Sequence, residues 1–177
     1  IDTVLCTHLH VDHVGWNTSW DAVAEKWVPT FPHAQYLFGQ VEYDHWAKHS
    51  AEGMFSQSQV MQDSVAPIID ADLHTFFAQD EDICPGIRLI PTPGHTPGHA
   101  SVMIESEGES AIITGDFLHH PCQFAHPEWP TAPDWDPTIG LATRLDIYEK
   151  LADTDTLVIG MHFHTPAAGY LKKDGKA

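Results

Sequence analysis

Short apolar runs separated by polar and turn-forming residues dominate this sequence. Apolar runs bounded by Gly, Pro or polar residues predict strands. The predicted strands cover residues 1–6, 36–38, 87–90, 101–105, 111–114 and 157–159. Helices are predicted over about 41–49 and 55–65. A last helix is predicted from Asp136, a good N-cap that precedes Pro137, through Ala152.

This mixture of strands and helices indicates an α/β fold, with chemistry-bearing residues in the polar segments. Pro29 and Pro32 mark a connection, and residues 121–135 form a proline- and tryptophan-rich loop. His and Asp residues follow predicted strands closely, in the segments 7–16, 91–99, 115–116 and 160–162. Loops at strand ends are where a rigid scaffold presents catalytic and binding side chains.

The composition points to metal and away from nucleic acid. The 14 His residues outnumber the 8 Lys and Arg together, although the chain contains no tag or low-complexity tract. A net charge of −17 argues against nucleic acid and against anionic membranes. No apolar run approaches the roughly 18 residues of a membrane span. We therefore expect a small-molecule substrate, no nucleic-acid partner and no membrane partner.

The three cysteines do not suggest a disulfide framework or a cysteine zinc site. Cys6, Cys84 and Cys122 are odd in number and lack a CxxC spacing. We expect all three to be small buried residues.

Four ligand-type residues fall within six positions after the first predicted strand. His8 and His10 stand two positions apart. In an extended segment both side chains therefore share a face and can converge on one ion. Asp12 and His13 follow where the chain turns, and can point to a second position nearby. Imidazole and carboxylate are the ligands that zinc favours without thiolate, and iron and manganese also accept them.

Three further candidates follow later strands. His95 lies in a Pro-Gly-His loop, Asp116 follows Gly115, and His162 follows Gly160 and Met161. His164 is an alternative to His162, which we prefer because it stands closer to the strand. His119 and His120 either line the substrate mouth or are solvated.

Together these motifs resemble the metallo-β-lactamase-fold hydrolase superfamily, in its lactonase and phosphotriesterase-like branch. The resemblance covers nearly the whole chain. Its motifs are Thr-His-Leu-His-Val-Asp-His at 7–13, Thr-Pro-Gly-His-Thr-Pro-Gly-His at 92–99, Thr-Gly-Asp at 114–116 and Gly-Met-His at 160–162.

The resemblance implies an αβ/βα sandwich that holds two divalent metal ions, most often Zn²⁺, with Fe or Mn as alternatives. One ion would be held by His8, His10 and His95. The other would be held by Asp12, His13 and His162, with Asp116 bridging the pair. Such domains normally carry several strands before the first motif. We therefore expect residues 1–177 to form a single domain that lacks much of its first sheet at the N-terminus.

The implied reaction is hydrolysis by a hydroxide shared between the two ions. Asp116 would fix the separation of the ions, and Asp12 could accept a hydrogen bond from the nucleophile. His99 and Thr96 beside His95, and Thr7 beside His8, are candidates to orient the ligands.

A lactonase or other carboxylic-ester hydrolase is the favoured function, and a phosphotriesterase would use the same core. A β-lactamase is less favoured, because those enzymes generally lack a carboxylate at the position of Asp116. Glyoxalase II carries a C-terminal helical region, whereas only a short tail follows His162 in this sequence. The nuclease branch conflicts with the charge, and flavodiiron proteins place Glu where His10 stands. A non-catalytic metal-binding protein is the remaining alternative.

Overall fold

The computed structural model describes residues 1–49 and 57–175. The chain divides into two compact units, Ile1–Ala78 and Gln79–Ala177. In the described ranges no helix combines the length and the apolar character needed to cross a bilayer.

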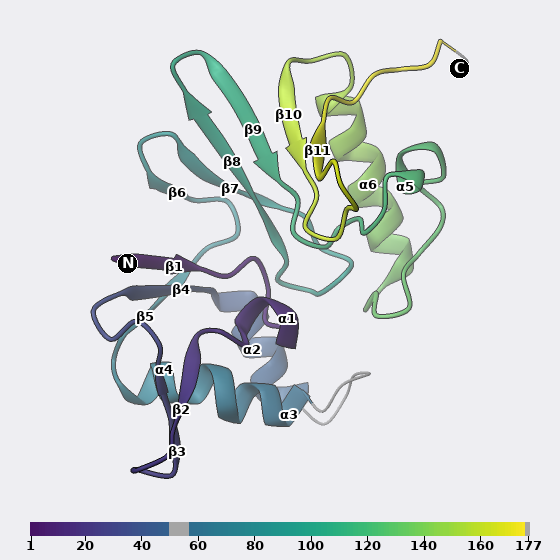
Figure 1. Cartoon of the computed structure of the whole chain (residues 1–177). Helices are drawn as coiled ribbons and strands as arrows, with labels where there is room; N and C mark the ends of the chain where they lie inside the picture. The colour runs from purple at the N-terminus through teal and green to yellow at the C-terminus, as the bar shows by residue number, and fades with distance from the viewer. Residues whose placement is uncertain (50–56, 176–177) are drawn as a thin grey trace. The chain divides into compact units, whose positions relative to one another are not determined.

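The first unit is built on a parallel sheet of three strands in the order β1-β4-β5 (Figure 1). These strands are β1 (Thr3–Leu5), β4 (Gln35–Gly39) and β5 (His74–Phe77). Its helices are α1 (Val11–Val14), α2 (Gln40–His49), α3 (Gln57–Val60), the π-helical segment η1 (Met61–Val65) and α4 (Ala66–Asp70). Tyr36 and Phe38 of β4 pack with Trp46, Val65 and Ile68 of the helices in one apolar core.

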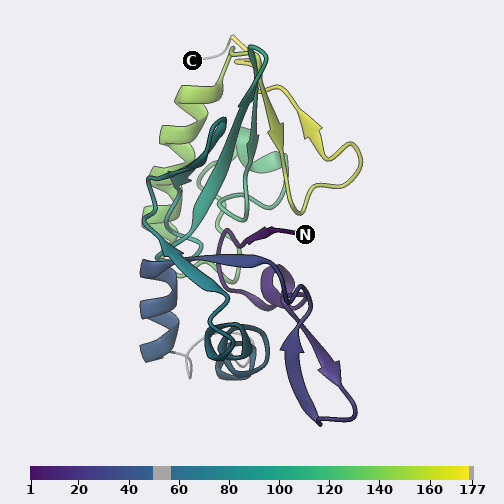
Figure 2. The same cartoon turned by 90° about the vertical axis from the view of Figure 1, so that its left-hand side faces the viewer.

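A hairpin of β2 (Thr18–Asp21) and β3 (Lys26–Pro29) extends from this unit (Figures 1 and 2). Trp20 and Trp27 form a cross-strand pair, with ring centroids 5.6 Å apart. The Asp21 carboxylate accepts hydrogen bonds from the amides of Ala24 and Val23, which lower its pKa. The sequence prediction of a plain connection at Pro29 is therefore wrong, because a proline at the last position of a strand disrupts no interior pairing.

The second unit contains a sheet of six strands in the order β11-β10-β9-β8-β7-β6. The strands are β6 (Asp82–Cys84), β7 (Ile87–Pro91), β8 (Ala100–Ser106), β9 (Glu109–Ile113), β10 (Thr156–Ile159) and β11 (Ala168–Gly169). Helix α6 (Pro137–Leu151) packs Ile147 and Leu151 against Ile112 and Val158 of the sheet. A single helical turn, α5 (Cys122–Ala125), lies inside the loop predicted at 121–135.

The mixed α/β fold is confirmed, and most predicted elements are present. The helix predicted over 55–65 is helical from Gln57 onward, and its first two residues lie outside the described ranges. The strands β2, β3, β5, β6 and β11 were not predicted. They are short and only partly buried, so the apolar pattern that marks a strand is weak. The single incomplete domain expected from the sequence stays a prediction.

Candidate metal centre

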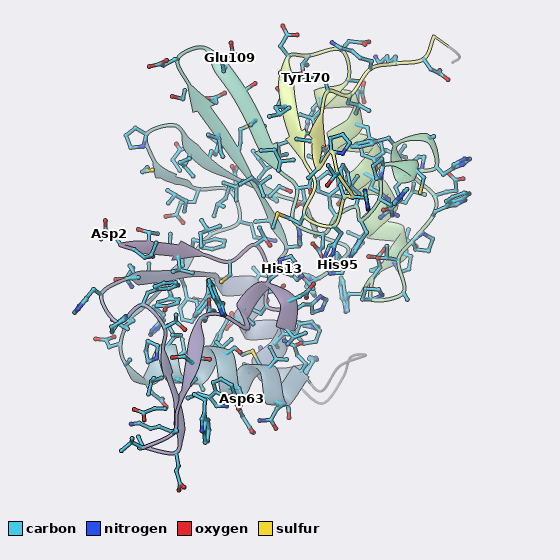
Figure 3. The ribbon with its side chains drawn as sticks, viewed as in Figure 1. Asp2, His13, Asp63, His95, Glu109 and Tyr170 are labelled. Atoms are coloured by element: carbon cyan, nitrogen blue, oxygen red, sulfur yellow. The ribbon has the colours of Figure 1, made fainter. Side chains whose placement is uncertain are left out.

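In the first unit, the predicted ligands lie on the short segment from β1 into α1. The His8 ring centroid lies 4.8 Å from that of His10 and 4.1 Å from that of His13. His13 Nε2 lies 3.5 Å from Asp12 Oδ2. The chain turns into α1 directly after His10, so Asp12 and His13 are helical rather than extended. The four residues therefore form one local cluster of imidazoles and a carboxylate, and Figure 3 labels His13 within it.

The backbone of this cluster is held through Leu9, which is fully buried between the two histidines. The Leu9 amide donates to Glu42 Oε1 at 3.1 Å, and its carbonyl accepts from Gln57 Nε2 at 2.7 Å. Glu42 is itself buried and accepts a second hydrogen bond, from the Trp46 indole at 2.7 Å. Glu42 of α2 and Gln57 of α3 thus fix the backbone of Leu9, the residue between His8 and His10. Glu42 lies in no sequence motif and was not among the predicted site residues.

In the second unit, three imidazoles converge on the carboxylate of Asp116. Its Oδ2 lies 3.0 Å from His162 Nε2, 3.2 Å from His119 Nε2 and 3.6 Å from His95 Nε2. The Asp116 side chain is only 3% exposed, whereas that of His162 is 38% exposed. The His119 and His162 rings stack, with centroids 4.9 Å apart. A buried anion with three imidazole nitrogens around it is a donor set that suits a divalent metal.

Parallel strand pairing explains how Asp116 and His162 meet. Strands β9 and β10 are parallel neighbours, with Ile113 opposite Ile159. Asp116 and His162 each stand three residues beyond the end of their strand. Because the carboxyl ends of parallel strands lie at one edge of a sheet, the two side chains reach the same place.

The loop that carries His95 joins β7 to β8 and packs closely on the start of α6 (Figure 3). Gly94 has φ +129°, and a Cβ there would lie 2.3 Å from Gly140 Cα, so no other residue fits. The amide of Trp135 donates to the His95 carbonyl, and that of Asp136 donates to the Gly94 carbonyl. The segment before α6 therefore determines where His95 lies.

His99 holds the backbone of Asp116. Its Nε2 accepts a hydrogen bond from the Asp116 amide at 2.8 Å, so its hydrogen must be on Nδ1. Nδ1 then donates to Thr92 Oγ1 at 2.8 Å, which leads on to Ser101 Oγ at 2.9 Å and from there to the Thr114 carbonyl at 2.7 Å. All these side chains are buried. The expectation that His99 supports His95 is thus replaced by a role toward Asp116.

Asp134 is the residue that supports His95. His95 Nδ1 lies 3.1 Å from Asp134 Oδ1, and both side chains are at most 2% exposed. Burial raises the pKa of Asp134, but hydrogen bonds from His95 and Thr131 outweigh it, and the pKa lies below its usual value. Among the described residues the Thr96 hydroxyl has no hydrogen-bond partner, so the expected support from Thr96 is wrong. Thr7 Oγ1 does lie 3.1 Å from His8 Nδ1, as expected.

The structure also separates the alternative histidines. His164 is exposed and its Nδ1 lies 3.2 Å from the Thr165 carbonyl, which leaves His162 as the better ligand candidate. His120 is exposed and accepts from the Cys122 amide. His119, to which the sequence assigned no definite role, belongs to the Asp116 cluster. His95, Asp116 and His119 each offer a ligand atom within 4.8 Å of the others.

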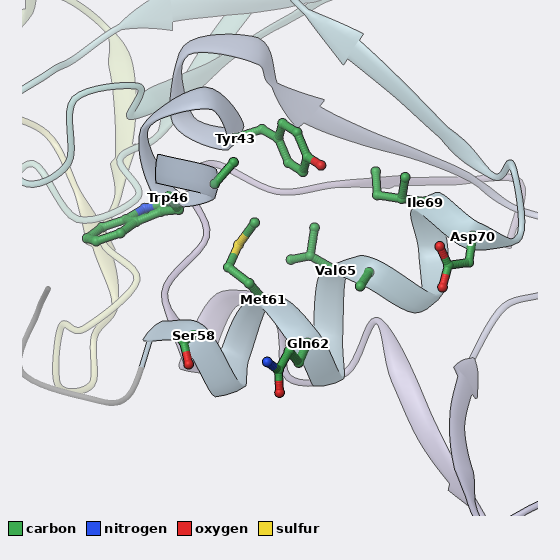
Figure 4. Close-up of a pocket in the computed structure, with 10 residues that line it drawn as sticks. Tyr43, Trp46, Ser58, Met61, Gln62, Val65, Ile69 and Asp70 are labelled. Atoms are coloured by element: carbon green, nitrogen blue, oxygen red, sulfur yellow. The ribbon is translucent and has the colours of Figure 1, made fainter. Parts of the chain in front are cut away.

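The first unit also has an apolar groove of about 280 Å³, shown in Figure 4. It lies between α2 and the helical segment that follows. Tyr43, Trp46, Met61, Val65 and Ile69 line it together with smaller and polar residues. Its lining includes no histidine, so we place the chemistry at the two clusters described above.

The comparisons with known proteins agree with the geometry of the two clusters. A family model described as "Metallo-beta-lactamase superfamily" matches residues 1–170. Among curated proteins, an N-acyl homoserine lactonase from a Bacillus species is 28% identical over 110 residues. The match covers 62% of this chain and 35% of that protein, so the chain spans about a third of the relative's length.

Among solved structures, the hydrolase AbOPH of the beta lactamase superfamily has a TM-score of 0.85 and 30% identity. That match covers 100% of this chain and 62% of AbOPH. An N-acyl homoserine lactone hydrolase has a TM-score of 0.61 and 26% identity, over 85% of this chain and 51% of its own. That enzyme was solved with N-hexanoyl-L-homoserine, its product, at the catalytic metal centre.

Proposed function

This chain belongs to the metallo-beta-lactamase superfamily, and on that basis we propose that it is a metal-dependent hydrolase of small-molecule esters, with lactones as the favoured substrates. The observation that carries the proposal is the buried Asp116 carboxylate, with the Nε2 atoms of three histidines within 3.6 Å of one of its oxygens. Desolvation of a carboxylate is costly unless cations or strong hydrogen-bond donors compensate it, and a bound divalent ion would supply the positive charge.

The residues present fit such ions well. Both clusters offer imidazole nitrogen and carboxylate oxygen, the donors of catalytic zinc sites that lack cysteine. We propose the ligand sets expected from the sequence: His8, His10 and His95 for one ion, and Asp12, His13 and His162 for the other. Asp116 serves both ions. Zinc is the favoured metal, and iron or manganese would accept the same donors.

When bound, the ions would lower the pKa of water and supply hydroxide near neutral pH. The protein residues hold and orient the reacting groups. Asp116 would hold the two ions at a set separation, because the hydrogen bond from its amide to His99 Nε2 fixes its backbone. Asp12, at the start of α1, can accept a hydrogen bond from the nucleophile.

The substrate class follows from the leaving group and from the relatives. Hydrolysis of a lactone or ester expels an alkoxide, which a second cation can stabilise directly. The curated relative and one of the structural relatives are N-acyl homoserine lactone hydrolases. A net charge of −17 also suits a small neutral substrate better than a polyanion.

The test is a kinetic comparison of lactones, aryl esters, a phosphotriester, a penicillin and a cephalosporin on metal-replete protein. We expect the highest kcat/KM for a lactone or activated ester. Asp116→Ala should reduce it by at least the roughly 10–100-fold that is typical when a metal site loses a supporting group. Asp146→Ala, at an exposed position on α6, is the control and should leave kcat/KM unchanged. Preference for a β-lactam, or full activity of Asp116→Ala, would contradict the assignment.

A further inference from the structure

Asp134 lies in the irregular segment before α6, yet its carboxylate is almost completely removed from solvent. The side chain is 2% exposed and lies against the His95 imidazole, which is 1% exposed. Buried carboxylates are rare unless paired, so one next to a ligand histidine calls for an explanation.

The contact between the two residues determines which nitrogen of His95 carries hydrogen. An ionised carboxylate can only accept hydrogen bonds. Because Asp134 Oδ1 lies 3.1 Å from His95 Nδ1, the hydrogen must be on Nδ1. In the neutral ring, Nε2 then keeps its lone pair, and this is the nitrogen on the side of Asp116, 3.6 Å from Oδ2.

The carboxylate is held in place from its other sides. Thr131 donates twice, from its hydroxyl to Oδ1 at 2.6 Å and from its amide to Oδ2 at 2.9 Å. Arg144 Nη1 lies 3.7 Å from Oδ2. The guanidinium is itself fixed, because Nε donates to the Pro127 carbonyl at 2.7 Å and Nη1 to the Phe117 carbonyl at 3.3 Å.

The buried pair of Asp134 and Arg144 also links the His95 ring to the segment that carries Asp116. Arg144 comes from α6, and the Phe117 carbonyl that it contacts belongs to the residue directly after Asp116. The same group of contacts thus restrains both the His95 ring and the segment that carries Asp116. A charge pair this deep is costly to desolvate, so packing alone does not account for it.

We propose that Asp134 is a positioning residue, which holds His95 with its hydrogen on Nδ1 and so directs the Nε2 lone pair toward the metal centre. This arrangement of carboxylate, histidine and metal raises the basicity of the ligand nitrogen and fixes the ring orientation. The inference rests on the metal-binding role proposed for His95, but it does not depend on the substrate or on hydrolysis.

A purely structural role is the competing explanation, since Asp134 also closes a turn with Thr131. The two explanations differ in what they require of His95. A turn-forming Asp134 leaves the tautomer and the metal affinity of His95 unaffected once the protein is folded. A positioning Asp134 controls both.

The first measurement uses the unmodified chain without metal, labelled with ¹⁵N. Long-range ¹H–¹⁵N correlation spectra distinguish the two neutral tautomers of each histidine, and His95→Gln identifies the His95 signals. We expect the pattern of the tautomer with hydrogen on Nδ1. The pattern of the other tautomer would overturn the proposal without any variant that could fail to fold.

The second measurement is zinc affinity, by competition with a chromophoric chelator. Asp134→Ala should weaken zinc binding roughly 10–100-fold, as loss of such a partner does elsewhere. Asp134→Asn keeps the shape but loses the charge and should weaken it less. Thr131→Val, which removes one donor to the carboxylate, should have the smallest effect of the three.

Asp136→Ala is the matched control. Asp136 stands two residues further on, and its side chain caps α6. Asp136→Ala removes a carboxylate from the same segment but keeps the backbone amide that donates to the Gly94 carbonyl, and it leaves the contact of the His95 ring intact. Its zinc affinity should equal that of the unmodified chain. A folded Asp134→Ala variant with unchanged zinc affinity would overturn the proposal. If lactones are not hydrolysed but the tautomer and affinity follow expectation, only the proposed function fails.

Discussion

The histidines of this chain differ in what their second ring nitrogen contacts. Asp134 lies at Nδ1 of His95, Thr92 lies at Nδ1 of His99, and Thr7 lies at Nδ1 of His8. A carboxylate at Nδ1 makes Nε2 a strong ligand, whereas a backbone amide at Nε2 of His99 prevents metal binding there. The group that each ring contacts, and not the residue type, therefore decides whether a histidine can bind a metal ion or supports a neighbouring residue.

His162 and His164 provide a direct comparison, because they are two residues apart and both are exposed. His162 Nε2 lies 3.0 Å from Asp116, whereas His164 contacts the Thr165 carbonyl. We expect His162→Ala to lower the zinc content, and to lower kcat/KM at least about 10-fold. His164→Ala should change neither. Elemental analysis and kinetics on both variants measure this, and a larger loss in His164→Ala would reverse the ligand assignment.

The cysteines should differ sharply in reactivity. Burial raises the pKa of Cys6 to about 12, so at pH 8 roughly one thiol in ten thousand is ionised. Cys84 is exposed and Cys122 is half-buried, so the expectation that all three cysteines are buried holds only for Cys6. Titration with a chromogenic disulfide at pH 8 should modify Cys84 quickly and Cys6 only after denaturation. Cys84→Ser should remove the fast phase, and fast labelling of Cys6 would contradict its burial.

Helix α6 begins with a cap that the sequence identifies. The Asp136 carboxylate accepts from the amides of Thr138 at 2.9 Å and Ile139 at 3.1 Å. We expect Asp136→Ala to lower the free energy of unfolding by about 1 kcal/mol, measured by urea denaturation. Asp146→Ala breaks only the exposed ion pair with Lys150 and should cost less than about 0.5 kcal/mol. Equal losses in the two variants would show that the cap contributes nothing.

The strand ends that carry the proposed ligands are positioned by different kinds of pairing. Parallel pairing brings the ends of β9 and β10 to one edge, whereas the antiparallel β7 and β8 are joined by the His95 loop itself. The loop therefore needs its own support, which Gly94 and the segment before α6 provide.

The chain as a whole combines a net charge of −17 with two clusters of His and Asp residues that we propose as metal ligands. Bound cations would offset part of this charge. Elemental analysis of the folded, metal-replete protein should find close to two equivalents of zinc, iron or manganese per chain. One equivalent would refute the dinuclear proposal, provided that circular dichroism shows the sample to be folded. Chelator treatment should remove the ions and the activity together, and zinc should restore both.

Local patterns were sufficient to predict the α/β class and the ligand-type residues. His8, His10, Asp12 and His13 are adjacent in the sequence, and His95, Asp116 and His162 each follow a predicted strand, so spacing along the chain marks them. The Asp136 cap is equally local, because a cap acts on amides two and three residues away.

Contacts between distant residues could not be predicted in this way. Glu42 binds the Leu9 amide from 33 residues away, and Asp134 binds His95 across 39 residues. Neither lies in a motif, and nothing in its neighbours distinguishes it from a solvated carboxylate. His119 and His99 stand close to proposed ligands in the sequence, but whether each ring faces the Asp116 side chain or its backbone depends on how the strands and α6 pack. Burial and partner choice arise from the packing of elements, so the side chains that orient the ligands emerge only from the folded chain.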